Sequence, residues 1–64
     1  KAEEMRKRLV ARHTLEARTA FVKQDLVGAI GAWDRVLALD PANETAKLER
    51  EKAVMLKQKV DRLK

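Results

Sequence analysis

Two short turn signals interrupt a chain that otherwise consists almost entirely of helix-forming residues. The first is Asp25, whose carboxylate can accept hydrogen bonds from the free backbone N–H groups of a following helix. The second is Asp40-Pro41, because a residue before proline is driven out of the helical region and proline is tolerated in a helix's first turn. Asp40 is therefore expected to end one helix and cap the next. These signals predict an all-α, three-helix chain, with helices at about residues 2–23, 26–39 and 42–63.

Length and composition limit what these helices can build. Charged residues make up 39% of the 64 residues and hydrophobic residues 45%, whereas aromatic residues make up only 3%. A chain of this size buries only about 60% of its unfolded surface, so we expect a single domain of marginal stability. No apolar run is long enough for a transmembrane helix and no signal-peptide core is present, which predicts a soluble chain and leaves its compartment open. The chain begins with Lys1, and we expect it to be a fragment of a larger protein.

Apolar residues recur at the three- and four-residue spacing of amphipathic helices. Trp33 lies in the middle of the second predicted helix and is expected to be the largest buried side chain. Small residues on the facing helix would allow a close approach around it. The predicted core consists of Ala17, Ala20, Phe21, Ala29, Ile30, Trp33 and Leu37.

One stretch, residues 17–43, combines small residues, aromatic residues and both turn signals at the offsets of a helix hairpin. The residues concerned are Ala17, Ala20-Phe21, Asp25-Leu26, Ala29-Ile30, Trp33, Leu37, Leu39-Asp40-Pro41 and Asn43. Together they resemble most of one tetratricopeptide repeat, a helix-turn-helix unit of about 34 residues. The repeat-like hairpin would span about residues 10–43, and the long third helix resembles the capping helix of such arrays. The first helix departs from the family pattern, with His13 where Trp is common, Glu16 where Leu is usual, and Gln24 where Gly is usual.

The resemblance implies a non-catalytic scaffold that binds a protein or peptide in a groove lined by the first helices of successive repeats. When the positions of the family pattern are matched to this sequence, the residues expected to face that groove are Ala11, Thr14, Arg18, Phe21 and Val22. Some members hold a peptide's C-terminal carboxylate with several Lys, Asn and Arg side chains. Here only Arg18 has a suitable group at a suitable position, so this specific activity is not expected. The other interpretation of Arg18 is a solvated cation or a local ion pair.

Both outer helices extend beyond the repeat-like unit and carry apolar residues without an obvious partner. The third helix has a seven-residue pattern, widened by Leu48 and Met55. Its members are Ala46, Glu49, Ala53, Leu56, Val60 and Leu63. Because an apolar heptad stripe is typical of helix pairing, we expect a homodimer formed through Met5 and Leu9 on one extension and Leu56, Val60 and Leu63 on the other. The alternative is that these ends fray, or pack on parts of the parent protein outside this sequence.

The formal net charge of +5 suggests a second interpretation of the function. Arg6-Lys7-Arg8 with Arg12 is the densest basic cluster, and it makes a basic helical module for nucleic acid or an anionic membrane surface the alternative interpretation. No stacking aromatic residue accompanies the cluster. A solvated face with local pairs is favoured, at Glu3–Lys7 and Glu4–Arg8. We therefore expect neither nucleic acid nor membrane as the partner.

Nothing in the sequence predicts an enzyme, a cofactor or a metal site. The chain has one histidine and neither cysteine nor serine. His13 and Glu16 could share a metal or a proton, but a packed or peripheral histidine is the favoured interpretation. Gly28 and Gly31 lie within a predicted helix rather than a phosphate-binding loop. With Ala32 they form a small-residue patch that could admit a close-packed neighbour such as a second subunit, and the alternative is tolerated sequence drift on an exposed face.

Overall fold

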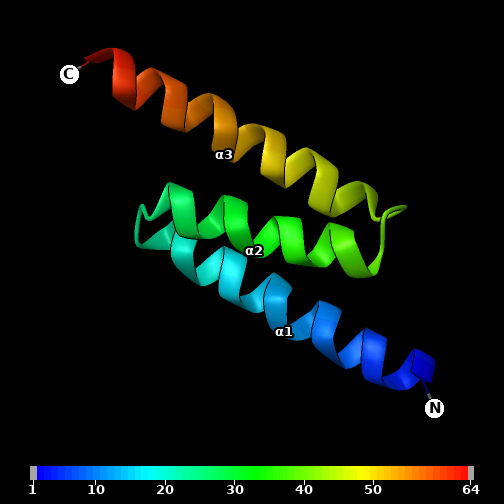
Figure 1. The fold of residues 1–64 in the computed structure, drawn as a ribbon. Helices are drawn as coiled ribbons and strands as arrows, with labels where there is room; N and C mark the ends of the chain where they lie inside the picture. Colours follow the sequence, from blue (N-terminus) through cyan, green and yellow to red (C-terminus); the bar gives the residue numbers. More distant parts are fainter. Residues whose placement is uncertain (1, 64) are drawn as a thin grey trace.

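The computed structural model describes residues 2–63, which form three α-helices joined by two short turns (Figure 1). Helix α1 comprises Ala2–Val22, α2 comprises Leu26–Leu39 and α3 comprises Glu44–Leu63. The predicted all-α, three-helix class is confirmed. The boundaries differ slightly, because α1 ends at Val22 rather than Lys23 and α3 begins at Glu44 rather than near residue 42.

The turn between α1 and α2 is closed by two nested backbone hydrogen bonds. The N–H of Asp25 donates to the carbonyl of Ala20 at 2.8 Å, and the N–H of Gln24 donates to the carbonyl of Phe21 at 2.9 Å. This is the hydrogen-bond pattern of a Schellman motif, whose penultimate residue takes a left-handed conformation. Gln24 occupies that position with a φ of 64°. The Asp25 carboxylate then accepts the N–H of Gly28 at 3.0 Å, which confirms Asp25 as the N-cap of α2.

The turn between α2 and α3 corrects the predicted role of Asp40. Its N–H donates to the carbonyl of Val36 at 2.7 Å, so Asp40 is the C-cap of α2. The N-cap of α3 is Asn43, whose side-chain oxygen accepts the N–H of Ala46 at 2.9 Å. Asp40 does not cap α3, because Pro41 and the next residue form the turn and only Asn43 directly precedes Glu44.

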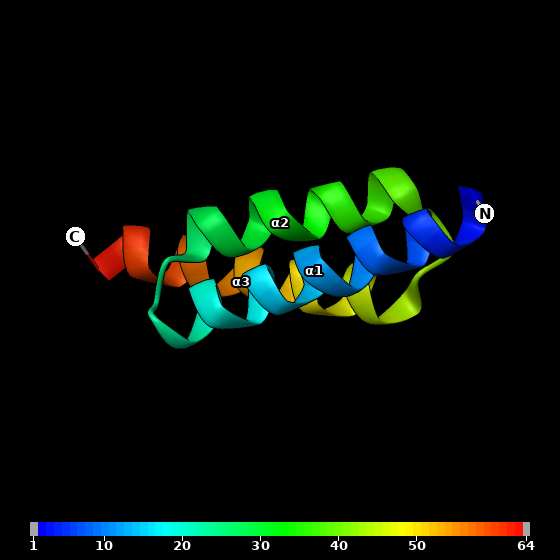
Figure 2. The same cartoon turned by 90° about the horizontal axis from the view of Figure 1, so that it is seen from below.

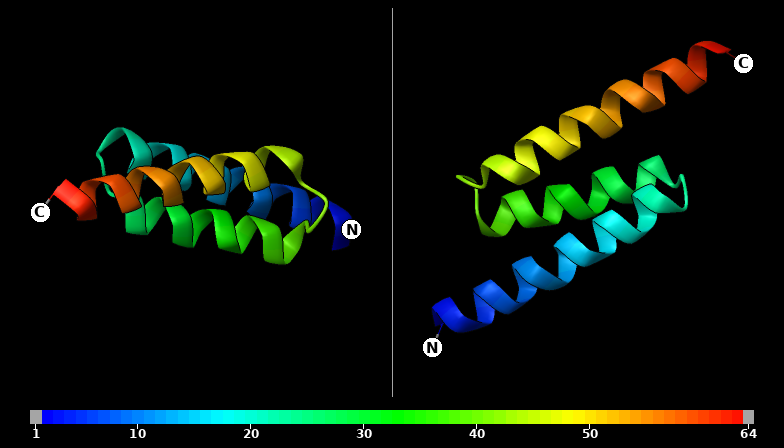
Figure 3. Two further views of the ribbon diagram at one scale, coloured as in Figure 1. Left: turned by 90° about the horizontal axis from the view of Figure 1, so that it is seen from above. Right: turned by 180° about the vertical axis from the view of Figure 1, so that it is seen from behind.

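Helix α2 packs against both other helices, which lie on the same side of it in the view of Figure 2, flank it in the right panel of Figure 3, and run in roughly the same direction. Across the contact between α2 and α3, the guanidinium of Arg50 pairs with the carboxylate of Asp34. The start of α1 and the end of α3 project past α2 in opposite directions (Figure 1). The result is an elongated molecule with extents of 47 × 20 × 13 Å.

The core lies where the three helices cross, and alanines supply most of it. Of the predicted core residues, Ala17, Ala29 and Trp33 are buried, whereas Ala20, Phe21, Ile30 and Leu37 are half-buried. Trp33 is 2% exposed and is the largest fully buried side chain, as predicted. The buried residues outside the prediction are Ala32, Val36, Ala46 and Ala53. Small side chains at the crossings let the helices approach closely enough to enclose the Trp33 ring.

Candidate functional site

A groove opens between the end of α1 and the second half of α3. Its larger hollow encloses about 550 Å³ and is lined by Phe21, Val22, Gln24, Leu26, Leu56 and Val60. A second hollow of about 260 Å³ is lined by Phe21, Lys52, Met55, Leu56 and Lys59. Since Phe21 and Leu56 line both hollows, the two form one surface, which we call the α1–α3 groove.

The groove exists because α2 supports only part of each outer helix. Phe21 and Val22 are the last residues before the α1–α2 turn, so no further turn of α1 covers them. Leu56 and Val60 lie one helical turn apart in the second half of α3. Val22 is 81% exposed, Leu56 41% and Val60 44%. These apolar side chains therefore belong to the surface rather than to the core, which makes the groove a candidate interaction site.

The groove combines residues that the sequence pattern assigned to two separate surfaces. Phe21 and Val22 come from the predicted partner-binding set, and Leu56 and Val60 come from the predicted self-association set. The pattern did not predict Leu26, Met55, Lys52 or Lys59 as groove residues. Helical spacing could place them on their own helices, but it could not predict which helix α3 would lie beside.

The other predicted partner-binding residues follow the same face of α1 away from the groove. Ala11 lines a separate hollow of about 250 Å³, together with Arg6, Lys7, Val10 and Asp40. Thr14 is half-buried and Arg18 is exposed. The five predicted residues therefore share one helical face, but only Phe21 and Val22 reach the groove.

The remaining self-association residues lie at opposite ends of the molecule. Met5 is 69% exposed and Leu9 40% exposed near the projecting start of α1. Leu63 is 88% exposed at the end of α3, where it continues the row of Leu56 and Val60 at helical spacing. Within one chain these groups cannot contact each other, so pairing them requires a second copy.

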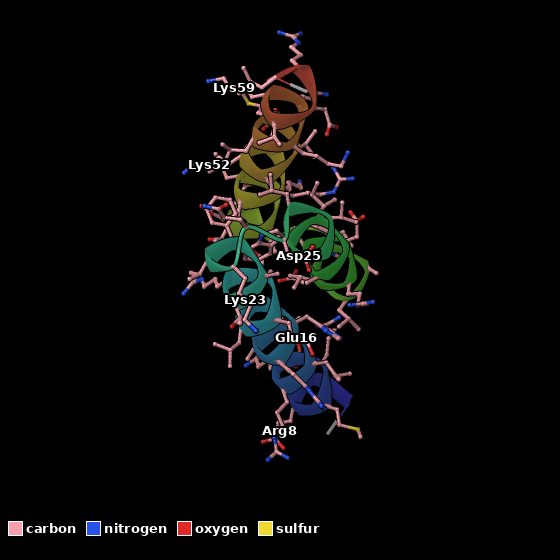
Figure 4. The ribbon with its side chains drawn as sticks, turned by 90° about the vertical axis from the view of Figure 1, so that its left-hand side faces the viewer. Arg8, Glu16, Lys23, Asp25, Lys52 and Lys59 are labelled. Carbon is pink, nitrogen blue, oxygen red and sulfur yellow. The ribbon has the colours of Figure 1, made fainter. Side chains whose placement is uncertain are left out.

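Two lysines give the groove its charge. Lys52 and Lys59 project from α3 to the same side, away from α2 (Figure 4). No acidic residue lines either hollow of the groove. The ammonium of Lys52 lies 3.5 Å from the Glu49 carboxylate, whereas within residues 2–63 no salt-bridge partner lies near Lys59. The site is therefore an apolar trough with one basic side.

His13 and Glu16 form a local pair on α1, at the position where a packed or peripheral histidine was the favoured interpretation. The Nδ1 atom of His13 lies 2.7 Å from Oε1 of Glu16, and the histidine is half-buried. The hydrogen bond from His13 lowers the pKa of Glu16, with further lowering from nearby positive charges that include Arg12 and Arg35. Within residues 2–63, no cluster of at least three His, Cys, Asp or Glu side chains could hold a metal ion.

The basic start of α1 is paired differently from the prediction. The Glu3 carboxylate lies 3.5 Å from the guanidinium of Arg6, and neither Glu3–Lys7 nor Glu4–Arg8 forms an ion pair in the described part of the chain. Arg8 extends away from the body of the molecule (Figure 4). These side chains are exposed, so the Glu3–Arg6 pair contributes little to folding and the cluster stays hydrated.

The predicted small-residue patch on α2 is not a single outer surface. Ala32 is 2% exposed and belongs to the core with Trp33 and Val36. Gly28 and Gly31 are only half-buried, so they do not share its environment. The predicted outer patch is wrong because Ala32 shares a helical face with Val36, which lies one turn after it, and this face is buried in the core.

Comparisons with known proteins supply no relative from which a function could be transferred. No family model, curated protein or solved structure matches this chain. Among residues 2–63, no helix is both long and apolar enough to span a membrane. The α1–α3 groove is therefore the feature from which a function can be argued.

Proposed function

We propose that this chain is a non-catalytic protein-interaction module of the tetratricopeptide-repeat type, which binds a protein segment in the α1–α3 groove. The observation that carries the proposal is the open apolar trough formed by Phe21, Val22, Leu56 and Val60. Water in contact with these side chains is released when a partner covers them, and this supplies the driving force for binding. Burying a few such side chains provides several kcal/mol, at roughly 1.5–3 kcal/mol for each fully covered one.

The helix arrangement supports the family assignment within this proposal. A groove lined by first helices requires two roughly parallel helices on one side of a third, and α1 and α3 lie in this way on α2 (Figure 2). Gln24 adopts a left-handed conformation at the position where the family usually has Gly. The left-handed backbone at this position gives a physical reason why the family prefers Gly there.

Self-association through the projecting ends is a second part of the proposal. Met5, Leu9 and Leu63 are exposed large apolar side chains outside the body of the molecule. A two-fold arrangement would place the start of α1 from each copy beside the end of α3 from the other. Both contacts would then form at once, which is what makes a closed dimer more stable than an open chain.

The exposed basic cluster at residues 6–8 supports one alternative function, which is a module that binds nucleic acid or an anionic surface. Binding that releases counterions from phosphates weakens steeply as salt rises. Binding through the apolar groove weakens far less over the same range, because apolar burial is not screened and only two cations, Lys52 and Lys59, line the groove. Measuring the salt dependence of any captured partner therefore separates the two functions.

Site-specific photo-crosslinking tests the proposed function. A benzophenone side chain at Val22 lies on the groove, and the same group at Val27 lies on an exposed position of α2 outside it. We expect a protein from a lysate of the source cells to crosslink at position 22 but not at 27. The crosslink should disappear in the Leu56→Glu variant. Equal labelling at both positions, or labelling that survives Leu56→Glu, would exclude the groove as the binding site.

A further inference from the structure

We propose, on the basis of the proposed function, that the occupant of the α1–α3 groove is an amphipathic helix with acidic residues along one flank. Its apolar face would contact Phe21, Leu56 and Val60. Two acidic side chains about two helical turns apart would face Lys52 and Lys59. The proposal concerns the chemistry of the partner segment and not its identity.

A helix suits this groove better than an extended peptide because both walls are helices. The backbone N–H groups within α1 and α3 are bonded inside their own helices, so they offer an extended chain no ladder of donors and acceptors. An extended peptide buried here would leave much of its own backbone unpaired, which is costly. A helical segment satisfies its backbone internally and presents side chains at the spacing that fits a groove between helices.

The charge of the groove selects an acidic flank. Lys52 and Lys59 are seven positions apart in the sequence, which is about 10 Å along a helix. Acidic residues with the same seven-residue spacing on a roughly antiparallel or parallel partner helix would meet both lysines, as flanking charges do in coiled coils. No acidic residue lines the groove itself, and the one ion pair that its lysines make in the described part of the chain is the contact of Lys52 with Glu49 at 3.5 Å.

The same charges disfavour a second copy of this chain as the groove's occupant. Its helix ends are basic on balance, with Arg6-Lys7-Arg8 against Glu3 and Glu4 on α1, and Lys57, Lys59 and Arg62 against Asp61 on α3. Placing either end in the groove would bring cations against Lys52 and Lys59 in a chain whose formal net charge is already +5. Like charges in contact oppose association, so an acidic partner is the better match.

Two synthetic peptides of about 15–20 residues provide a direct test, at a length where an isolated helix becomes populated. Both have leucines along one helical face. One has glutamates and the other lysines at the flanking positions with seven-residue spacing. Each is titrated by calorimetry into the 64-residue chain and two double variants. The groove variant is Lys52→Glu/Lys59→Glu, and its matched control is Arg35→Glu/Lys47→Glu, which changes net charge equally at exposed positions outside the groove.

We expect the acidic peptide to bind the parent chain and to bind the groove variant about tenfold more weakly, since two attractive pairs become repulsive. The control variant should bind it within about twofold of the parent, because charges farther away are screened. The basic peptide should show the opposite preference and bind the groove variant better than the parent. Circular dichroism of each variant verifies that its helices are intact.

Three results would overturn the acidic-helix proposal, and each leaves a different conclusion for the groove. If both peptides bind the parent equally and Leu56→Glu abolishes both, the groove binds helices without selecting acids. If neither peptide binds, the occupant is not a helix of this kind, and crosslinking at Val22 still decides whether the groove binds protein. If sedimentation shows a dimer that Leu56→Glu dissociates while the groove variant still pairs, the occupant is a second copy.

Discussion

The carboxylate of Asp25 lies directly over Gly28. One of its oxygens accepts the N–H of Gly28 at 3.0 Å, and a β-carbon added to Gly28 would overlap the other. Gly31, one turn later, has nothing within 4 Å of where its β-carbon would be. The two glycines of α2 therefore differ, because only at Gly28 does the Asp25 N-cap leave no room for a β-carbon.

Alanine substitution distinguishes these two glycines. Gly31→Ala should stabilise the chain by about 1 kcal/mol, the difference in helix propensity between the two residues. Gly28→Ala gains the same propensity but displaces the Asp25 cap, which is worth about 0.5–2 kcal/mol, so we expect no net gain or a loss. Urea unfolding followed by circular dichroism measures both variants. Equal stabilisation by the two substitutions would show that the cap does not depend on Gly28.

The left-handed conformation of Gln24 is a source of strain that glycine would relieve. With φ at 64°, a residue with a β-carbon is disfavoured by roughly 1–2 kcal/mol, although glycine also loses more entropy on folding. We expect Gln24→Gly to raise stability by about 0.5–1 kcal/mol and Gln24→Val to lower it, because β-branched residues rarely adopt this region. Thermal melts of the two variants beside Gln24→Ala isolate the backbone effect from loss of the side chain.

Trp33 should be indispensable to the fold. It is 2% exposed and is enclosed by small residues that cannot expand to fill its space. Trp33→Ala should cost about 3–5 kcal/mol, which is comparable to the whole stability of a chain this small. Far-ultraviolet circular dichroism should show a chain largely unfolded at room temperature. A variant that melts within a few degrees of the parent would mean that the core is held together elsewhere.

The His13–Glu16 pair predicts a specific dependence on pH. Because the hydrogen bond from His13 lowers the pKa of Glu16, the pair stabilises the fold at pH values above the ordinary 4.5 of a glutamate. That contribution is lost as the pH falls through the lowered pKa and the carboxylate takes up a proton. Carbon-13 NMR titration should find the Glu16 pKa below 4.5 in the parent and near it in His13→Ala. Since Glu16 is exposed, the effect on stability should be small.

Sequence reasoning predicted the helices well because their determinants are local. The Asp25 cap and the break at Asp40-Pro41 depend only on neighbouring residues, and both lie where expected. The N-cap of α3 was predicted one turn early, because the sequence around Asp40-Pro41 contains two side chains that can cap, Asp40 and Asn43. Local chemistry alone does not decide between them. The path of the chain after Pro41 places Asn43, and not Asp40, beside the first free N–H groups.

The groove was harder to predict because it depends on how helices far apart in sequence are arranged. Helical spacing put Leu56 and Val60 on one face of α3, but that face could equally have met a second copy. Only the three-dimensional arrangement of the helices places Leu56 and Val60 around the same hollow as Phe21. The position of Lys52 and Lys59 at the groove also depends on this arrangement. The sequence alone does not distinguish these two lysines from the other lysines of α3.

The projecting ends predict how this chain associates with itself. Met5, Leu9 and Leu63 are apolar and exposed, yet the basic residues around them repel a second copy. We therefore expect a dimer in sedimentation equilibrium that tightens as salt screens this repulsion, together with a melting temperature that rises with protein concentration. Leu63→Glu should weaken the dimer about tenfold or more by placing a charge in the apolar contact. Glu51→Gln, an exposed change elsewhere on α3, serves as the control and should leave the dimer unchanged. A monomer at every concentration and salt would instead mean that these ends do not pair with each other, and the α1–α3 groove would remain the only interaction site proposed for the chain.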